Sequence, residues 1–254
     1  MNNLFDLRGK KALVTGGARG IGFSCARALG EAGASLLLAD MREAELREAK
    51  VALESEGISV ATFMCDISES ESVQDLSEKV RQTGGTDIFV NSAAMIDRKP
   101  LLEMTDEEWS RIIITNLNGA YYLGKNIGKF MVEQGRGGRI IYIVSTGAFR
   151  ASENYGAYSA SKAGVVMLMK TLALELAPYG ILCNALAPTA TDTKFVSDYY
   201  AANPGKREKV AKNHPLGRLA IPEDYMGTIV YLSSEASAFV TGTVLTVDGG
   251  KTAR

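Results

Sequence analysis

Residues 11–22 read KALVTGGARGIG and determine the architecture of the chain. Lys11 to Thr15 form a short apolar run that is typical of a buried strand, and a helical pattern begins directly after the glycines. Glycine lets the backbone turn tightly and approach a ligand closely, while the N–H groups at a helix start attract an anion. The order of strand, glycine turn and helix therefore predicts a cradle for a phosphate or diphosphate.

The glycines of this turn stand at Gly16, Gly20 and Gly22, with Cys25 where the general G-x-G-x-x-G fingerprint has its last glycine. A second apolar run, Ser35 to Ala39, ends in Asp40, about twenty residues beyond the turn. A carboxylate there can accept hydrogen bonds from ribose hydroxyls and repels a 2′-phosphate, which favours NAD over NADP. Arg19 and Arg42 can soften that repulsion, and Asp40 can alternatively open the next helix.

Strand-like runs alternate with helical patterns along the whole chain and predict one α/β domain over residues 1–254. The fold class is a single-domain, Rossmann-type, doubly wound parallel sheet of about seven strands with helices on both faces. Two capping boxes are predicted, Ser68 with Glu71 and Thr105 with Glu108, and Pro222 marks a further helix start. The seven runs are Lys11–Thr15, Ser35–Asp40, Val60–Cys65, Asp87–Asn91, Arg139–Ser145, Ile181–Ala187 and Thr243–Val247.

Tyr158 and Lys162 are four residues apart and therefore share one face of a helix. An ammonium beside a phenol favours the phenolate, so the pair predicts a tyrosine pKa below its usual ~10 and a proton exchanger near neutral pH. The alternative is an ordinary solvated helix face.

Composition narrows the class of protein. A net charge of −1 over 254 residues, without a basic tract, gives no reason to expect a nucleic acid or an anionic membrane as partner. We find no signal peptide pattern and no spanning segment, and Cys25, Cys65 and Cys183 are read as reduced, packed thiols, so a cytoplasmic protein is expected. His214 is the single histidine, which disfavours a serine hydrolase, and no metal site is expected.

The chain resembles the short-chain dehydrogenase/reductase family in its small form, over nearly its whole length. The resemblance is carried by Thr15-Gly16 to Gly22, Asn91-Ser92-Ala93-Ala94, Asn116, Ser145, Tyr158 with Lys162, Asn184 with Pro188, and the closing Val240-Thr241-Gly242 and Val247-Asp248-Gly249-Gly250. Two departures are visible, both at the edge of the expected nicotinamide pocket. The family's Asn-Asn-Ala-Gly is Asn91-Ser92-Ala93-Ala94 here, and its Pro-Gly pair is Pro188-Thr189.

The resemblance implies the roles of the site residues. Tyr158 would exchange the hydroxyl proton of the substrate, Ser145 would bind the substrate oxygen, and Lys162 would bind the nicotinamide ribose. Asn116 is a poor helix former followed closely by Asn118-Gly119, so a local break is expected within the helical stretch from Glu107 to Glu133. By the resemblance, this break would open the helix around a water that connects Lys162 to solvent. Asp66 would meet the adenine amino group or simply cap the next helix. The implied cofactor contacts are Gly16, Arg19, Gly20, Ile21, Gly22, Asp40, Asp66, Ile67, Asn91, Ala93, Tyr158, Lys162, Pro188, Thr191 and Thr193.

Residues 189–214 have few apolar repeats and follow the strand expected on the nicotinamide side. We interpret them as a substrate loop, either a lid to which Phe195, Tyr199 and Tyr200 contribute or a passive surface excursion.

The predicted function is hydride transfer between NAD, with NADP not excluded, and a secondary alcohol or ketone, with a sugar, polyol or sugar acid preferred as substrate. One alternative is a 3-oxoacyl carrier-protein reductase, which would need a basic landing patch and, by the resemblance, usually NADP. Another class is a non-catalytic nucleotide-sensing module, which would not need the four residues Asn116, Ser145, Tyr158 and Lys162. The resemblance also implies a homotetramer paired through long helices.

Overall fold

A computed structural model describes residues 3–253, except the side chains of residues 194, 195, 197 and 198. All seven strands are parallel and lie in the order β3-β2-β1-β4-β5-β6-β7. The strands are β1 (Lys11–Thr15), β2 (Ser35–Asp40), β3 (Val60–Met64), β4 (Ile88–Asn91), β5 (Gly138–Ile143), β6 (Ile181–Pro188) and β7 (Val244–Val247). The α-helices are α1 (Gly20–Glu31), α2 (Glu43–Ser55), α3 (Ser70–Gln82), α4 (Asp106–Ile113), α5 (Gly119–Gln134), α6 (Gly156–Leu176), α7 (Lys194–Ala201), α8 (Lys206–Lys212) and α9 (Met226–Ser233).

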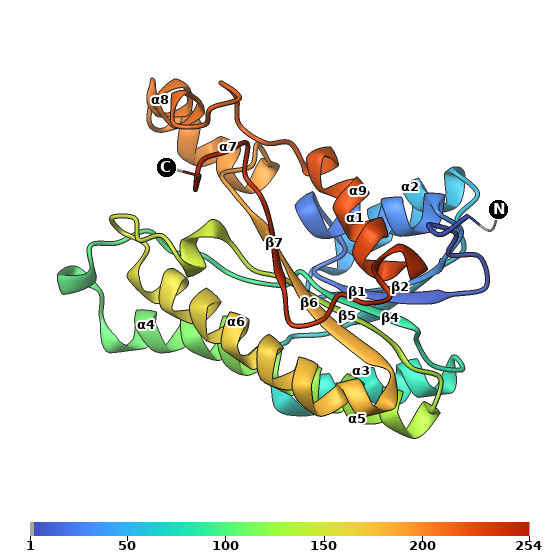
Figure 1. The fold of residues 1–254 in the computed structure, drawn as a ribbon. Coiled ribbons are helices and arrows are strands. Elements are labelled where there is room, and N and C mark those ends of the chain that lie inside the picture. The colour runs from blue at the N-terminus through green and yellow to red at the C-terminus, as the bar shows by residue number, and fades with distance from the viewer. Residues whose placement is uncertain (1–2, 254) are drawn as a thin grey trace.

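Helices cover opposite faces of the sheet, as Figure 1 shows, and a hydrophobic core lies under each layer. On one face α1, α2 and α9 pack, with Leu29, Leu53 and Ile229 buried. On the other face α3, α5 and α6 pack, with Leu76 and Ile127 buried. Strand order reverses between β1 and β4, and in such sheets ligands bind beyond the carboxyl ends of the strands at that reversal. The chain therefore forms the predicted doubly wound architecture.

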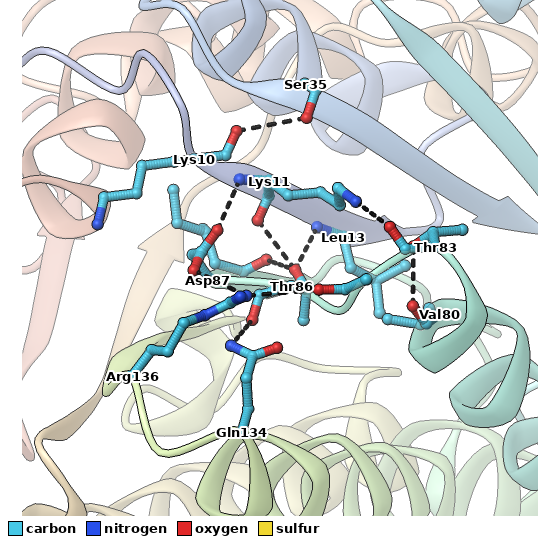
Figure 2. A network of polar contacts seen from close by, with 12 residues as sticks. Lys10, Lys11, Leu13, Ser35, Val80, Thr83, Thr86, Asp87, Gln134 and Arg136 are labelled. Atoms are coloured by element: carbon cyan, nitrogen blue, oxygen red, sulfur yellow. Dashed lines mark hydrogen bonds and ion pairs between the residues drawn. The ribbon is translucent and has the colours of Figure 1, made fainter.

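The amino ends of β1 and β4 are tied by a buried polar network, drawn in Figure 2. The Thr86 hydroxyl accepts from Leu13 N at 3.2 Å and can donate to the carbonyl oxygen of Lys11 or Ile88. Asp87 Oδ2 accepts from Lys11 N at 3.0 Å. Because register fixed at one end of paired strands sets the other end, these contacts help to bring the carboxyl ends of β1 and β4 to the same level.

The structure corrects several details of the sequence prediction. Strand ends differ by one or two residues, which is the usual uncertainty of element boundaries. The capping box at Thr105 and Glu108 is confirmed. The one at Ser68 and Glu71 is wrong, because Glu69 occupies the N-cap position of α3 without a side-chain cap and Ser68 bonds Asp66. Residues 189–214 contain two short helices that the sequence did not predict, α7 and α8, joined and flanked by non-helical segments beyond the carboxyl end of β6 (Figure 1).

Within residues 3–253, no helix combines the length and apolarity needed to cross a bilayer. In that same range no three His, Cys, Asp or Glu side chains come together as a metal-binding group. Cys25, Cys65 and Cys183 are buried as thiols.

Candidate active site

The turn after β1 forms a surface on which side chains cannot be added. Gly16 has φ +69°, and a Cβ there would lie 2.6 Å from Ala93 N. A Cβ on Gly22 would lie 2.1 Å from Gly16 O. Helix α1 begins at Gly20 and has no acidic residue in its first turn. These clashes show that the turn packs too tightly to carry side chains. A tight glycine turn that leads into a helix start without acidic residues fits a diphosphate, as the sequence predicts.

Asp40 ends β2 beside this turn, and its side chain is buried. Its carboxylate accepts from Ala18 N at 3.3 Å and from Arg42 N at 3.1 Å, and it pairs with the Arg42 guanidinium at 3.4 Å. The carboxylate therefore joins the glycine turn to the start of α2. Arg42 is held close to the position where a ribose 2′ group would meet Asp40.

The next strand ends bring further predicted contacts to the same edge of the sheet. Asn91 is buried, and its Oδ1 accepts from the Thr15 hydroxyl at 3.0 Å, which joins β4 to β1. Asp66 follows β3, and its Oδ1 accepts from both N and Oγ of Ser68, so this carboxylate organises the turn into α3. Ile67 packs against Gly119, where a Cβ would lie 2.8 Å from Ile67 O.

Asn116 breaks the helical stretch as predicted. Residues Ile114–Asn118 form a π-helical turn between α4 and α5. The buried amide of Asn116 accepts from Met95 N at 2.8 Å and donates to Met95 O at 2.9 Å and to Ser161 Oγ at 3.1 Å. Its side chain thus clamps the segment after β4 onto α6.

Ser145, Tyr158 and Lys162 meet where β5 ends and α6 begins. Ser145 caps a short 3-10 helix, its Oγ accepting from Gly147 N at 3.0 Å. Tyr158 lies beside it, since a Cβ on Gly147 would be 3.4 Å from Ser145 Oγ and 3.8 Å from Tyr158 Cε1. The Lys162 Nζ is 5.8 Å from the centre of the Tyr158 ring and donates to Ile143 O at 2.9 Å. Ser145 and Tyr158 therefore lie side by side, and the Lys162 ammonium lies next to the Tyr158 ring.

The pKa values of this group correct the sequence prediction. Burial raises the pKa of Tyr158 to about 12, outweighing the Ser145 hydrogen bond and the positive charge of Arg98, both of which lower it. Burial also lowers the pKa of Lys162 to about 8. The expected downward shift of the tyrosine pKa is therefore wrong for this structure, because desolvation of the phenolate outweighs the nearby charges.

The segment from Pro188 to Thr193 runs from the end of β6 back to the glycine turn. The Thr191 hydroxyl donates to Thr189 O at 2.9 Å and lies 2.7 Å from the Tyr225 hydroxyl. Thr193 lies over the turn, since its Cγ2 is 3.8 Å from where a Cβ of Gly20 would be. Of the two threonines implied by the resemblance, Thr193 thus lies next to the glycine turn. The Thr191 hydroxyl is hydrogen-bonded to other residues of the protein.

Arg98 is a residue of this site that sequence reasoning missed. It follows β4, donates from Nε to the Tyr155 hydroxyl at 2.7 Å, and its guanidinium lies 4.0 Å from the Tyr199 ring centre. Tyr155 in turn lies edge-on to Tyr158, with 6.2 Å between ring centres. In the described part of the chain no carboxylate pairs with Arg98. An arginine in a connecting segment carries no sequence signal, because solvated cations are common there.

α7 reaches the site through Tyr199, and α8 contacts the same side chain, because Lys206 Nζ donates to the Tyr199 hydroxyl at 2.7 Å. The Phe195 side chain lies outside the described residues, so its expected place in the lid stays a prediction. Tyr200 is half-buried, and burial raises its pKa, while the positive charge of Arg98 lowers it.

Comparison with known proteins gives a consistent group of relatives. The family model described as enoyl-(acyl carrier protein) reductase matches residues 16–252. A gluconate 5-dehydrogenase of Gluconobacter oxydans (strain 621H) is 34% identical over 251 residues, covering 98% of this chain and 97% of the relative. A galactitol 2-dehydrogenase of Agrobacterium fabrum (strain C58) is 34% identical over 252 residues, covering 96% and 98%.

Solved structures agree with this grouping. A gluconate 5-dehydrogenase from Burkholderia cenocepacia J2315, in complex with NADP and tartrate, superposes with a TM-score of 0.93 at 32% identity, covering 99% of this chain and 98% of that chain.

Proposed function

The chain belongs to the short-chain dehydrogenase/reductase family, whose members act on CH–OH groups with NAD(P), and from this premise we propose that it oxidises or reduces a sugar, polyol or sugar acid. The observation that carries the proposal is the grouping of Ser145, Tyr158 and Lys162 at the carboxyl edge of the sheet. A Cβ on Gly147 would lie 3.4 Å from Ser145 Oγ and 3.8 Å from Tyr158 Cε1, and Lys162 Nζ is 5.8 Å from the Tyr158 ring centre. That edge also holds the bare glycine turn, so a bound cofactor and a substrate hydroxyl would meet there.

The nicotinamide supplies hydride transfer when bound, and the residues of this chain supply the proton chemistry. Ser145 would orient the substrate oxygen, and Tyr158 would give or take its proton. A pKa of about 12 keeps the phenol protonated at neutral pH, which suits a donor in the reducing direction. Lys162 would hold the nicotinamide ribose from its position below the tyrosine. Asn116 would keep the helix open for the proton path.

The experiment that tests this function is a panel of aldonates, polyols and ketoses with NAD or NADP, followed by the absorbance of the reduced nicotinamide. Turnover of at least one substrate is expected. If none of the panel reacts while both cofactors bind, the sugar-type substrate is wrong. If neither cofactor binds, the chain does not use NAD or NADP and the enzyme proposal is wrong.

Asp40 supports a preference for NAD, although the Burkholderia relative holds NADP. We expect Asp40→Ser to raise the ratio of kcat/KM with NADP to kcat/KM with NAD by about tenfold or more. The substitution removes the repulsion of a 2′-phosphate and releases the Arg42 guanidinium, which pairs with Asp40 at 3.4 Å. Initial rates with both cofactors measure the ratio.

Glu43→Ser is the matched control for Asp40→Ser, because Glu43 is an exposed carboxylate next to Arg42 that pairs with Arg47. It changes the net charge equally and should leave the cofactor ratio within twofold of wild type. A wild-type enzyme that already prefers NADP contradicts the NAD assignment.

Arg98 supports a substrate that carries a carboxylate. Its guanidinium stands beside the tyrosines Tyr155 and Tyr199 and close enough to Tyr158 to lower its pKa, so a planar, bidentate cation faces the reacting group. Tartrate, a dicarboxylate, is bound in the Burkholderia relative. We therefore place sugar acids ahead of neutral polyols as the substrate class.

Arg98→Gln should lower kcat/KM for an aldonate by about tenfold or more, the effect of losing a hydrogen bond to a charged group, and change kcat/KM for a neutral polyol by less than threefold. Steady-state kinetics on both substrates measure the difference. Lys99→Gln is the control, because the neighbouring Lys99 is already paired with Glu108 at 2.8 Å. An equal loss on both substrates would mean that Arg98 only supports the fold of the site.

Within residues 189–214, we propose α7 as the part that acts as the lid. Tyr199 on α7 contacts Arg98 across the site, whereas Arg207 on α8 pairs with Asp192 and His214 after α8 contacts Thr189. These contacts support α7 as the covering element and α8 as its anchor.

Exposed apolar side chains support a homotetramer. Tyr121 on α5 and Met167 and Leu174 on α6 are exposed, and Phe239 before β7 is fully exposed. Apolar surface of this kind is usually covered by a partner in soluble proteins. We propose pairing through the long helices α5 and α6, and a cytoplasmic location in keeping with three thiols.

A further inference from the structure

The departure of Pro188-Thr189 from the family's Pro-Gly pair has a partner far along the chain. Thr189 Oγ1 lies 2.8 Å from Nε2 of His214, the single histidine of the sequence. Both side chains are buried, with exposed fractions of 9% and 3%. The Thr189 hydroxyl, which the family's glycine lacks, therefore contacts His214. His214 is not among the predicted catalytic or cofactor-binding residues.

The imidazole is held on its other side as well. His214 Nδ1 lies 2.9 Å from Val210 O, and His214 N donates to Ala211 O at 3.0 Å. A carbonyl oxygen only accepts, so Nδ1 carries a proton, and the Nε2 contact with the Thr189 hydroxyl uses the second ring nitrogen. The ring thus links the last turn of α8 to the end of β6.

The backbone segment that follows His214 packs against the C-terminal part of the chain. Gly217 N donates to His214 O at 2.8 Å, and Leu216 N donates to Gly249 O at 3.3 Å. Pro215 lies against Gly250, where a Cβ would come within 3.1 Å of it. The imidazole is therefore a fixed point rather than a side chain on a mobile surface.

Residues 189–193 are held between this point and a second one. Tyr225 is fully buried and its hydroxyl lies 2.7 Å from Thr191 Oγ1. Ala220 pairs with Thr191 as an isolated parallel bridge. Thr193, beyond them, lies over Gly20 of the glycine turn. Movement of the segment at Thr189 would change how Thr191 and Thr193 meet a bound cofactor.

We propose that His214 is a positioning residue that sets cofactor affinity by fixing Thr189, an inference that rests on the proposed use of NAD or NADP. The second link between the same two elements, Arg207 with Asp192, joins partly exposed side chains, and such pairs contribute little. The buried Thr189–His214 bond is the stronger link, because a buried group that loses its partner pays its full desolvation cost.

The test compares Thr189→Val, which keeps the side-chain shape and removes the hydroxyl, with Thr189→Ser, which keeps the hydroxyl. The Kd values of NADH and NADPH are measured by calorimetric titration on the full chain. Thr189→Val and His214→Asn should each weaken cofactor binding about fivefold, the effect of one hydrogen bond, and Thr189→Ser should stay within about twofold of wild type. The double variant Thr189→Val/His214→Asn should bind the cofactors no more weakly than either single variant, because both substitutions remove the same contact.

A matched control separates positioning from stability. Thr86→Val removes a fully buried threonine hydroxyl at the amino edge of the sheet (Figure 2), so it should lower the melting temperature and leave both Kd values unchanged. The single histidine also gives one set of imidazole NMR signals, and these should shift when cofactor is added to the wild type. The inference is overturned if Thr189→Val binds the cofactors as tightly as wild type. A wild type that binds neither cofactor overturns the proposed function itself.

Discussion

Tyr158→Phe is expected to lower kcat by at least ~10²-fold on a verified substrate, the low end for lost general acid–base catalysis, with the Kd of the cofactor little changed. The ring is retained, so its edge-on contact with Tyr155 at 6.2 Å remains, and only the hydroxyl is lost. Steady-state kinetics and cofactor titration measure the two quantities separately.

Tyr179→Phe is the control for this substitution, because Tyr179 is an exposed tyrosine just beyond the far end of α6. It should keep wild-type turnover. Should Tyr158→Phe also stay within a few-fold of wild type, Tyr158 is not the acid–base residue and the proposed mechanism fails.

The pH profile provides a further signature of the same hydroxyl. Oxidation of an alcohol needs the phenolate as proton acceptor, so kcat/KM for oxidation should rise with pH through the alkaline range towards the Tyr158 pKa of about 12. Because the Lys162 pKa of about 8 is crossed in that range, the observed ionisations belong to the pair. Tyr158→Phe should lack the rise.

Lys162→Ala is expected to have the larger effect, with turnover falling by more than ~10²-fold and the cofactor Kd rising together. The buried ammonium donates to Ile143 O at 2.9 Å, so its loss leaves a buried carbonyl without that donor and removes the positive charge below Tyr158. Turnover and cofactor titration on the same preparation test the joint loss.

The control is Lys10→Ala, which removes an exposed ammonium just before β1, at the opposite edge of the sheet. It should leave turnover and cofactor affinity as in the wild type. A Lys162→Ala variant with unchanged cofactor affinity would mean that this lysine does not hold the nicotinamide ribose. Thermal unfolding of both variants shows whether α6 remains folded.

The sequence alone determined the sheet and much of the edge that carries the site. Apolar runs followed by glycines or polar residues are local signals, and in a parallel sheet they bring all the carboxyl ends to one edge. Gly16, Asp40, Asn91 and Ser145 therefore lie at that edge as predicted, and the break at Asn116 is visible in the sequence as a poor helix former followed by glycine.

The tertiary structure alone decided the contacts between distant segments and the balance of burial against charge. The pairing of Thr189 with His214 spans 25 residues, and Arg98 meets Tyr199 across the site, so neither leaves a periodic signal. Likewise, sequence spacing put Lys162 beside Tyr158 but could not weigh desolvation, which depends on how completely the folded chain surrounds the phenol. Local pattern thus specified the elements and their order, while packing specified which side chains meet and how burial shifts their pKa values.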